Sequence, residues 1–303
     1  AWGISMDAEA LRTFLAIHQT GGISSGATKL GRSQPAISRR IALLEEELGV
    51  PLFERVASGV VLSQAGHVLL PHAQRVLAAL GDCRAAVDAL HAGEAGPVSL
   101  AIVGTLAGAS LTPVLKRFSS AYPDVDLRLQ TANSKEVSEL VRGGEMNLGL
   151  RYHNDSSLEL DCHEIMSEPL KIVCSPSHKL AAQQVPSLRA LENESWLAFP
   201  GADKQPETSA NNLFAQFQML GIAKIKWTPI DSITAQKRLV EAGYGLAVLP
   251  ISAIEDETAN GLLATISVAD LKLANPIFLV TRSGGFLSAA ATAMIEMLRQ
   301  TEI

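Results

Sequence analysis

One apolar seam constrains the fold of this chain more than any other feature of its sequence. Between residues 69 and 90, apolar side chains recur at intervals that alternate between four and three, as in a coiled coil. The seam consists of Leu69, Ala73, Val76, Leu80, Cys83, Val87 and Leu90. This spacing predicts one long helix over about residues 64–91, with Pro71 bending its first part. A lone helix cannot bury the seam, so we assign dimerisation to all of its members except Ala73.

The sequence before the seam has the pattern of short helices followed by a hairpin. Helical spacing predicts one helix over about residues 8–19, ended by "TGG", and a second over about 24–30. A third helix is expected from Ser33, whose hydroxyl can cap it, with Pro35 tolerated in its first turn. "GVPLFERVASGVVLS" then predicts a small hairpin with its tip at Ser58-Gly59. This order is typical of a winged helix-turn-helix.

After Pro97 the pattern changes to strands that alternate with helices. The strand-like segments are "VSLAIVG", "VDLRLQT", "MNLGLRY", "WLAFP", "IKWTPI", "GLAVLP" and "PIFLVT". Alternation of this kind implies parallel sheets covered by helices. About two hundred residues with this pattern suit two α/β subdomains with a cleft between them.

The region of the third helix sorts its charges by sign. Basic side chains come first, at Lys29, Arg32, Arg39 and Arg40, and acidic ones follow at Glu45, Glu46, Glu47 and Glu54. At about 100° per residue, an apolar face forms from Ile37, Ile41, Leu44 and Leu48. The opposite, N-terminal face carries Gln34, Pro35, Ser38, Arg39 and Ala42.

The chemistry of that exposed face suits double-stranded DNA. Arginine binds guanine at two atoms, glutamine binds adenine, and small apolar groups touch the thymine methyl in a major groove. The helix N-terminus and the Ser33 hydroxyl suit a phosphate, whereas the acidic half must stay outside the groove. The alternative is the solvated face of an ordinary amphipathic helix.

Composition excludes several other classes. No apolar run reaches the roughly eighteen residues that a membrane span needs, and no basic region precedes an apolar core as in a signal peptide. Three well-separated cysteines suit free thiols in a reducing cytoplasm. The net charge of −6 leaves room for a small DNA-binding module joined to an acidic domain. Residues 1–5 are interpreted as an expression scar that precedes the natural start at Met6.

Residues 6–70 resemble the N-terminal domain of LysR-type transcriptional regulators. The motifs that carry the resemblance are "MDAEALRTFLAIHQTGGISSGATKLGRSQPAISRRIALLEEELGVPLFER" and "LSQAGHVLLPHA". Weaker likeness continues through "PLKIVCSPSHKL" and "RLVEAGYGLAVLP". Three positions depart from the family pattern: Gly26 replaces alanine, the hairpin tip lacks a basic residue, and Asn147 replaces aspartate. The glycine should cost the second helix roughly 1 kcal/mol.

The resemblance implies a three-part chain that works without enzymatic activity. A winged helix-turn-helix would occupy residues 6–64, a dimerising linker helix 65–93, and an effector-binding domain 94–303, resembling type 2 periplasmic binding proteins. Subdomain I would cover about 94–166 and 269–303, and subdomain II about 167–268. By position, the DNA-contacting residues would be Ser33, Gln34, Pro35, Ser38 and Arg39, to which we add Arg40. Most members of the family are dimers of dimers, and an activator would also contact RNA polymerase.

In this family the effector lies between the subdomains, at strand ends and helix N-termini. The residues expected there are Thr105, Leu106, Thr131, Phe199, Pro200 and Ser232. Their hydroxyls and free amides suit a small organic or aromatic acid, with Arg151 and Lys204 as possible charge partners. Each hydroxyl taken alone is more often a plain helix cap.

The alternative function is an α/β enzyme or a solute-binding protein with an incidental helical N-terminus. Gly22–Gly26 matches G-x-S-x-G, but a helix and not a strand precedes its serine. We find no phosphate-binding loop, no cofactor fingerprint, and no metal spacing among the histidines or at Cys162-His163. A redox pair of Cys162 and Cys174 is a minor alternative. The sequence does not distinguish an activator from a repressor.

Overall fold

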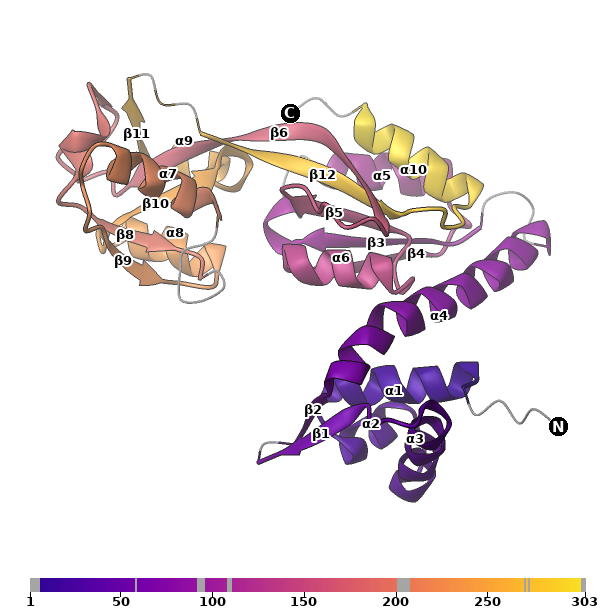
Figure 1. Cartoon of the computed structure of the whole chain (residues 1–303). Helices are drawn as coiled ribbons and strands as arrows, with labels where there is room; N and C mark the ends of the chain where they lie inside the picture. The colour runs from indigo at the N-terminus through magenta and orange to yellow at the C-terminus, as the bar shows by residue number, and fades with distance from the viewer. Residues whose placement is uncertain are drawn as a thin grey trace.

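Helix α4 (Gln64–His91) joins a small helical domain to a larger α/β part (Figure 1). Its bounds agree with the helix that the heptad seam predicts. The structure, a computed structural model, describes residues 6–57, 59–91, 96–107, 111–200, 208–269, 271 and 273–300. Among these described residues, no helix is both long enough and apolar enough to cross a membrane.

The N-terminal domain is three helices with a hairpin. Its elements are α1 (Ala8–Thr20), α2 (Ile23–Lys29), α3 (Gln34–Leu48), β1 (Phe53–Val56) and β2 (Gly59–Leu62). Asp7 caps α1 by accepting a hydrogen bond from the Ala10 amide at 2.7 Å, and Gly21 ends it with φ 68°. Phe14, Leu44 and other apolar side chains form one core, which confirms the predicted apolar face of α3.

Two expectations about this domain change. The Ser33 hydroxyl makes no capping hydrogen bond, and the α3 amides are met by its backbone carbonyl, which accepts from Ala36 at 3.1 Å. Gly26 is buried, and a Cβ there would lie 3.1 Å from a side-chain carbon of Ile17. The glycine thus lets α1 and α2 approach closely, which its helix propensity alone does not indicate.

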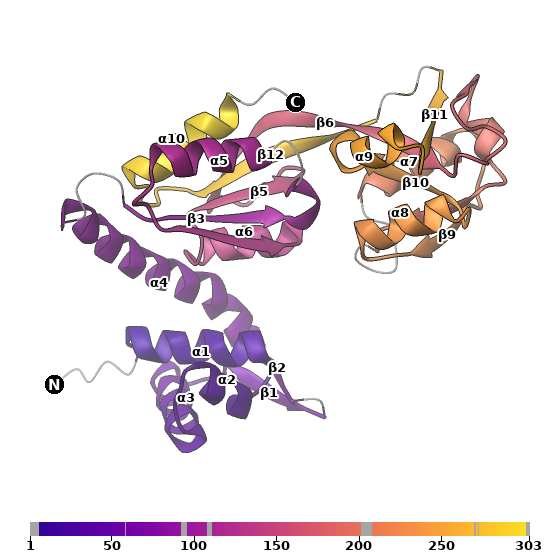
Figure 2. The ribbon, with the colours of Figure 1, turned by 180° about the vertical axis from the view of Figure 1, so that it is seen from behind.

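The described α/β residues form one hydrophobic core cluster in subdomain I and two in subdomain II. Subdomain I is built from β3 (Val98–Val103), η1 (Gly104–Leu106), α5 (Leu111–Ala121), β4 (Leu127–Ala132), α6 (Ser134–Arg142), β5 (Leu148–Tyr152), β12 (Ala274–Arg282) and α10 (Ala289–Arg299). Helices α5 and α10 cover one face of its sheet, and α6 covers the face toward α4 (Figures 1 and 2). Asn147 accepts hydrogen bonds from the Ser99 amide and hydroxyl at 3.1 and 2.8 Å, so it ties the chain before β5 to β3.

Subdomain II has its own strands and helices around two hydrophobic clusters. They are β7 (Gln184–Val185), η2 (Leu188–Leu191), β8 (Ser195–Ala198), α7 (Thr208–Met219), β9 (Lys226–Pro229), α8 (Ile233–Glu241), β10 (Leu246–Pro250), η4 (Ile251–Ala253), α9 (Glu255–Ala259) and β11 (Ala264–Val268). Trp196 is buried at the centre, with its ring edge-on to Phe214 and Phe217.

Two long strands connect the subdomains. β6 (Leu160–Cys174) carries the chain into subdomain II and β12 carries it back, as Figure 1 shows. The strand order is β4-β3-β5-β12-β6-β10-β8-β9, and both connecting strands pair antiparallel to their neighbours. The expected parallel pairing is present within each subdomain, between β3, β4 and β5 and between β8, β9 and β10. The antiparallel pairs come from β6 and β12, because strands that leave a subdomain and return to it must run in opposite directions.

Helix α4 also contacts subdomain I of its own chain. The Arg282 guanidinium lies 2.6 Å from the Asp82 carboxylate, and both side chains are mostly buried. Gly144, with φ 72°, faces Ala78, and a Cβ on the glycine would lie 2.8 Å from that of Ala78. Gln19 of α1 donates a hydrogen bond to Glu145 at 3.3 Å. These contacts fix the linker helix against the α/β part, and we refer to the set as the linker seat.

Candidate DNA-binding face and effector cleft

The N-terminal half of α3 presents an exposed polar face. Gln34, Pro35 and Arg39 are exposed, Ser38 is half-buried, and Ile37 points into the core. Ser33 precedes the helix and is also exposed. The geometry therefore leaves this face open to a partner, while the buried apolar face anchors it on α1.

The basic side chains near α3 differ in their partners. Arg40 lies 3.4 Å from Asp7 and 3.3 Å from Glu9, and Arg32 lies 3.6 Å from Glu9. Lys29 donates a hydrogen bond to Gln19 at 2.5 Å. Of the four basic residues between Lys29 and Arg40, Arg39 is the one with no ion pair or side-chain hydrogen bond to any described residue. Because one residue turns a helix by about 100°, Arg40 faces the acids of α1, and we withdraw it from the DNA-contacting set.

The acidic half of α3 contributes to the fold. The Glu45 carboxylate accepts hydrogen bonds from the Leu52 and Phe53 amides at 2.7 and 3.4 Å. It therefore holds the start of the hairpin against the end of the helix. Glu46 and Glu47 are exposed, as expected of acids that stay outside the groove.

The hairpin carries a basic side chain, Arg55, that is absent from the sequence-based set of DNA-contacting residues. Arg55 lies on β1 opposite Val60 and is exposed. The predicted tip at Ser58-Gly59 falls partly outside the described residues, since Ser58 is not among them. The basic position is therefore on the strand and not at the tip, where the family pattern places it.

The seam on α4 is buried at its start and exposed along its middle. Ala73 belongs to the core of the N-terminal domain and Leu69 packs against that core. Val76 is 48% exposed, Leu80 45% and Val87 54%, and Cys83 is exposed. The side chain of Leu90 lies outside the described residues. An exposed apolar stripe of this kind needs a partner.

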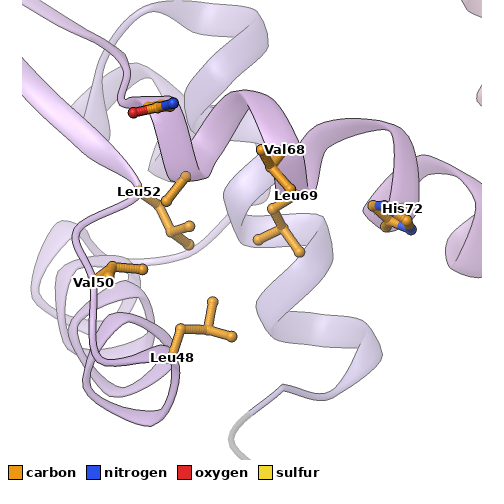
Figure 3. A pocket seen from close by; sticks show the side chains of 8 residues that line it. Leu48, Val50, Leu52, Val68, Leu69 and His72 are labelled. Atoms are coloured by element: carbon orange, nitrogen blue, oxygen red, sulfur yellow. The ribbon is translucent and has the colours of Figure 1, made fainter.

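An apolar groove lies beside the start of the seam (Figure 3). Leu48 and Val50 form one side, and Val68, Leu69 and His72 of α4 form the other. Its volume is about 500 Å³. Because Val50 and Val68 are 44% and 64% exposed, the groove extends the apolar stripe onto the N-terminal domain.

The cleft between the subdomains contains two cavities that share Thr105 and Phe199. The outer cavity, of about 390 Å³, is also lined by Pro200, Asn133 and Asp231. The inner cavity, of about 30 Å³, is bounded by Tyr152 and Asn275, together with Gln236 of α8. Strand ends and helix starts therefore meet here, as expected for a ligand site in an α/β fold.

The structure brings only some of the predicted effector residues to these cavities. Thr105, Phe199 and Pro200 line them. Leu106 is buried in the core of subdomain I, and Thr131 is exposed on β4 while its neighbour Ala132 lines the cavity. We therefore remove both from the candidate set.

Ser232 and the two proposed charge partners also change status. Ser232 caps α8 by accepting a hydrogen bond from the Ala235 amide at 3.4 Å. Arg151 contacts Asp155 at 2.8 Å and the Ser138 hydroxyl at 2.5 Å, so its charge is already matched. Burial alone would raise the pKa of Asp155, but hydrogen bonds from Ser138 and Ser157 and the charge of Arg151 lower it well below its ordinary value. Lys204 lies outside the described residues.

A buried carboxyl lies behind the inner cavity. Glu168 on β6 is 2% exposed and accepts hydrogen bonds from the Tyr152 hydroxyl at 3.1 Å and from the Ser252 hydroxyl. Tyr152 is in turn 2.9 Å from the Thr105 hydroxyl. Burial raises the pKa of Glu168, and the two hydrogen bonds oppose that rise. Sequence analysis missed Tyr152, Glu168 and Gln236 because only the tertiary structure places them together.

The raised pKa of Glu168 predicts a specific pH dependence of stability. The folded state holds the proton more tightly than the unfolded state, so its stabilising effect is complete below the unfolded pKa of about 4.3 and is lost as the pH rises through the folded pKa. Urea unfolding from about pH 8 to about pH 4.5 should therefore show the parent gaining stability relative to Glu168→Gln on acidification. Glu164→Gln, on the exposed side of the same strand, should follow the parent. Parallel profiles for the parent and Glu168→Gln would contradict this prediction.

Cys162 and Cys174 do not form the redox pair that was the minor alternative. Cys162 and Cys174 lie near opposite ends of β6, roughly 40 Å apart at the rise of an extended strand. Burial raises the pKa of the Cys162 thiol, and burial with the nearby Glu194 raises that of Cys174 to about 11. Both side chains therefore favour the unreactive thiol form.

A helix-turn-helix face, a linker helix and a two-lobed cleft on one chain define a ligand-responsive DNA-binding regulator. Comparison with protein families agrees with this class. Residues 8–67 match the family described as "Bacterial regulatory helix-turn-helix protein, lysR family", and residues 91–302 match the one described as "LysR substrate binding domain".

Individual relatives are similar over almost the whole chain. CbbR of Rhodospirillum rubrum, an HTH-type transcriptional regulator, is 27% identical over 95% of this chain and 94% of its own length. The HTH-type transcriptional regulator TfdS of Cupriavidus pinatubonensis is 30% identical over 90% of this chain and 92% of its own. The crystal structure of CbnR, a LysR family transcriptional regulator, shares the fold with a TM-score of 0.65 and 24% identity, covering 97% of this chain and 99% of that one.

The chain therefore belongs to the LysR family of transcriptional regulators. The relatives CbbR and TfdS are both named as HTH-type transcriptional regulators.

Proposed function

We propose that this regulator reads promoter DNA with the exposed face of α3 and responds to a small molecule in the cleft. The observation that carries the DNA-binding proposal is the state of Arg39, which is exposed and makes no ion pair with any described residue, although it lies among matched charges. A guanidinium held on the front of a helix, with its neighbours neutralised, is suited to guanine in a major groove. Arg55 is proposed to contact the phosphate backbone from the hairpin.

The proposed DNA-contacting set follows the exposed face. Gln34 and Arg39 would contact base edges, Pro35 a thymine methyl, and Ser33 a phosphate. Ser38, half-buried beside them, would contact either a base edge or a phosphate. This set differs from the one that the sequence suggested in a single respect: Arg40 is left out and Arg55 is included.

We propose that two α4 helices pair antiparallel about an axis near Leu80. Val76, Cys83 and Val87 would then lie in the interface, and Leu69 would approach the far end of the partner helix. The groove beside Val68 would receive that end, which covers the apolar stripe over its length. Assembly of two such dimers into a tetramer is proposed from the family resemblance.

We propose that the effector occupies both cavities of the cleft. Thr105, Phe199 and Pro200 remain from the sequence-based set, and Asn133 and Gln236 are added. A small organic acid is proposed, with its anionic end in the outer cavity, where α6 and α8 begin. Its binding would change the angle between the subdomains, and the linker seat would pass that change to α4. If the protein activates transcription, RNA polymerase is a further partner. Binding to promoter DNA would place the protein in the cytoplasm.

The division of the chain is also proposed on physical grounds. Residues 6–64 would form the DNA-binding domain, 65–93 the linker and 94–303 the effector-binding domain. Side chains of β6 up to Met166 pack on the core of subdomain I, and those from Leu170 pack on the two clusters of subdomain II. A subdomain boundary at about 167 is therefore reasonable, and the return would fall at about 268–269, before β12.

Replacing Arg39 by alanine should weaken binding to a specific site by about 1–3 kcal/mol. Affinity for random duplex should fall much less, because it rests mainly on phosphate contacts. Footprinting on the upstream region of the protein's own gene would supply the site. Fluorescence anisotropy at fixed salt would then give both affinities.

Arg40→Ala is the matched comparison for Arg39→Ala. Its guanidinium is occupied by Asp7 and Glu9, so we expect a small loss of domain stability and an unchanged preference for the specific site. Equal losses on specific and random duplexes for Arg39→Ala would remove its base-reading role.

A further inference from the structure

The inner cavity has a hydrogen-bonding character of its own, which the cleft as a whole does not show. At about 30 Å³ it has room for one small polar group. It lies at the junction of the subdomains, with Tyr152 on β5, Asn275 on β12 and Gln236 on α8. What it binds depends on which hydrogen-bonding atoms remain available inside it.

Gln236 contributes an acceptor. Its side chain is 1% exposed, and its amide nitrogen donates to the Ile230 carbonyl at 2.9 Å. A carbonyl only accepts, so this bond fixes the orientation of the amide. The Oε1 atom then has no hydrogen-bond partner among the described residues. A buried acceptor without a partner is costly, and a ligand that donates to it removes that cost.

Thr105 also contributes an acceptor, because the hydrogen bond between Tyr152 and Glu168 sets the direction of the one between Thr105 and Tyr152. The Tyr152 hydroxyl donates to the Glu168 carboxyl at 3.1 Å, so the single proton of that hydroxyl points to Glu168. In the 2.9 Å contact with Tyr152, Thr105 must therefore be the donor. Its proton is directed to Tyr152, and its oxygen lone pairs are left for a ligand.

We propose that the inner cavity binds a hydrogen-bond-donating group of the effector, a hydroxyl or an ammonium, and rejects a carboxylate. This inference rests on the proposed function, in which the cleft is the effector site. It narrows the effector from an organic acid in general to one that also carries a hydroxyl or amino group. That group enters first, toward Thr105 and Gln236, and the carboxylate stays in the outer cavity.

The test uses two small ions of opposite hydrogen-bonding character, methylammonium and formate, with the full-length protein. Crystals would be soaked in each salt at equal concentration and ionic strength, and each affinity would be measured by NMR titration. We expect methylammonium in the inner cavity, with its nitrogen contacting the Thr105 and Gln236 oxygens. Its affinity should exceed that of formate by about tenfold or more, the effect of one or two hydrogen bonds. Formate in the cavity, both ions bound equally, or neither ion bound would overturn the inference.

Two variants locate the effect on the proposed atoms. Thr105→Val keeps the shape and removes the acceptor oxygen, and Gln236→Met keeps the length of the side chain without its amide. Each should lose methylammonium binding by about tenfold. Thr292→Val, at an exposed threonine on α10 away from the cleft, is the control and should bind as the parent does. Two variants are used because Gln236→Met also loses the bond to Ile230.

DNA binding separates this inference from the proposed function. Anisotropy with the footprinted site measures the regulator, and ion binding measures the cavity. A protein that takes methylammonium but no specific DNA would contradict the proposed function alone. One that binds its site but takes formate would contradict the inference alone.

Discussion

Leu80→Asp should abolish the dimer and, with it, tight binding to the operator. Leu80 is 45% exposed in the single chain and lies at the middle of the exposed part of the seam. In an antiparallel pair the two aspartates would meet near the axis, where desolvation and like charge together cost several kcal/mol. One half-site contact is too weak by itself, so operator affinity should fall together with the dimer. Sedimentation velocity and anisotropy would measure both.

The control for Leu80→Asp is Arg75→Asp, on the same helix but turned about 140° away from Leu80 at 100° per residue. Arg75 is exposed and contacts only His72 among the side chains described. The Arg75→Asp protein should remain dimeric. Circular dichroism should be unchanged in both variants, because Leu80 is not part of the N-terminal core. A Leu80→Asp protein that stays dimeric and binds its operator would show that the seam serves a contact within one chain.

Asp82→Ala should detach the linker helix from the α/β part of the chain. The change leaves the mostly buried Arg282 guanidinium without its carboxylate, at a cost of about 2–3 kcal/mol. Hydrogen exchange should rise along α4 near residue 82 and in the adjoining end of β12. Urea unfolding of Asp82→Ala, Arg282→Met and the double variant would give the coupling between the two side chains.

Asp88→Ala provides the comparison for the linker seat. Asp88 is an exposed acid on the same helix and forms no ion pair with any residue described here, so its loss should change stability by less than about 0.5 kcal/mol. If the double-variant cycle gives no coupling between Asp82 and Arg282, the seat does not hold α4 in solution. In that case the proposed route from cleft to DNA would need another contact.

The charges on α3 show which residue positions can be assigned from sequence and which need the tertiary structure. Helical periodicity correctly separated the buried Ile37, Ile41 and Leu44 from the exposed Arg39. Arg40 joined Arg39 in the sequence-based DNA-contacting set although the helical wheel does not place it on the exposed face, and a helical wheel contains no information about the neighbouring helix. The acids Asp7 and Glu9 reach Arg40 only when α1 packs against α3.

The sequence by itself determined the elements whose pattern is local. The seven-membered seam defined α4, alternation of strands and helices defined the α/β part, and the motif in residues 6–70 defined the family. Local patterns succeed here because burial on one face of a helix or strand repeats with the period of that element.

Only the tertiary structure decided the polarity of the cleft and the position of the linker helix. Glu168, Tyr152 and Thr105 come from β6, β5 and η1, and their hydrogen bonds form only when β6 and β12 connect the two subdomains. Gln236 approaches them from the far side of the cleft, and Asp82 meets Arg282 across two hundred positions of sequence. Contacts of this kind depend on packing between elements, and packing leaves no periodic signal in the chain.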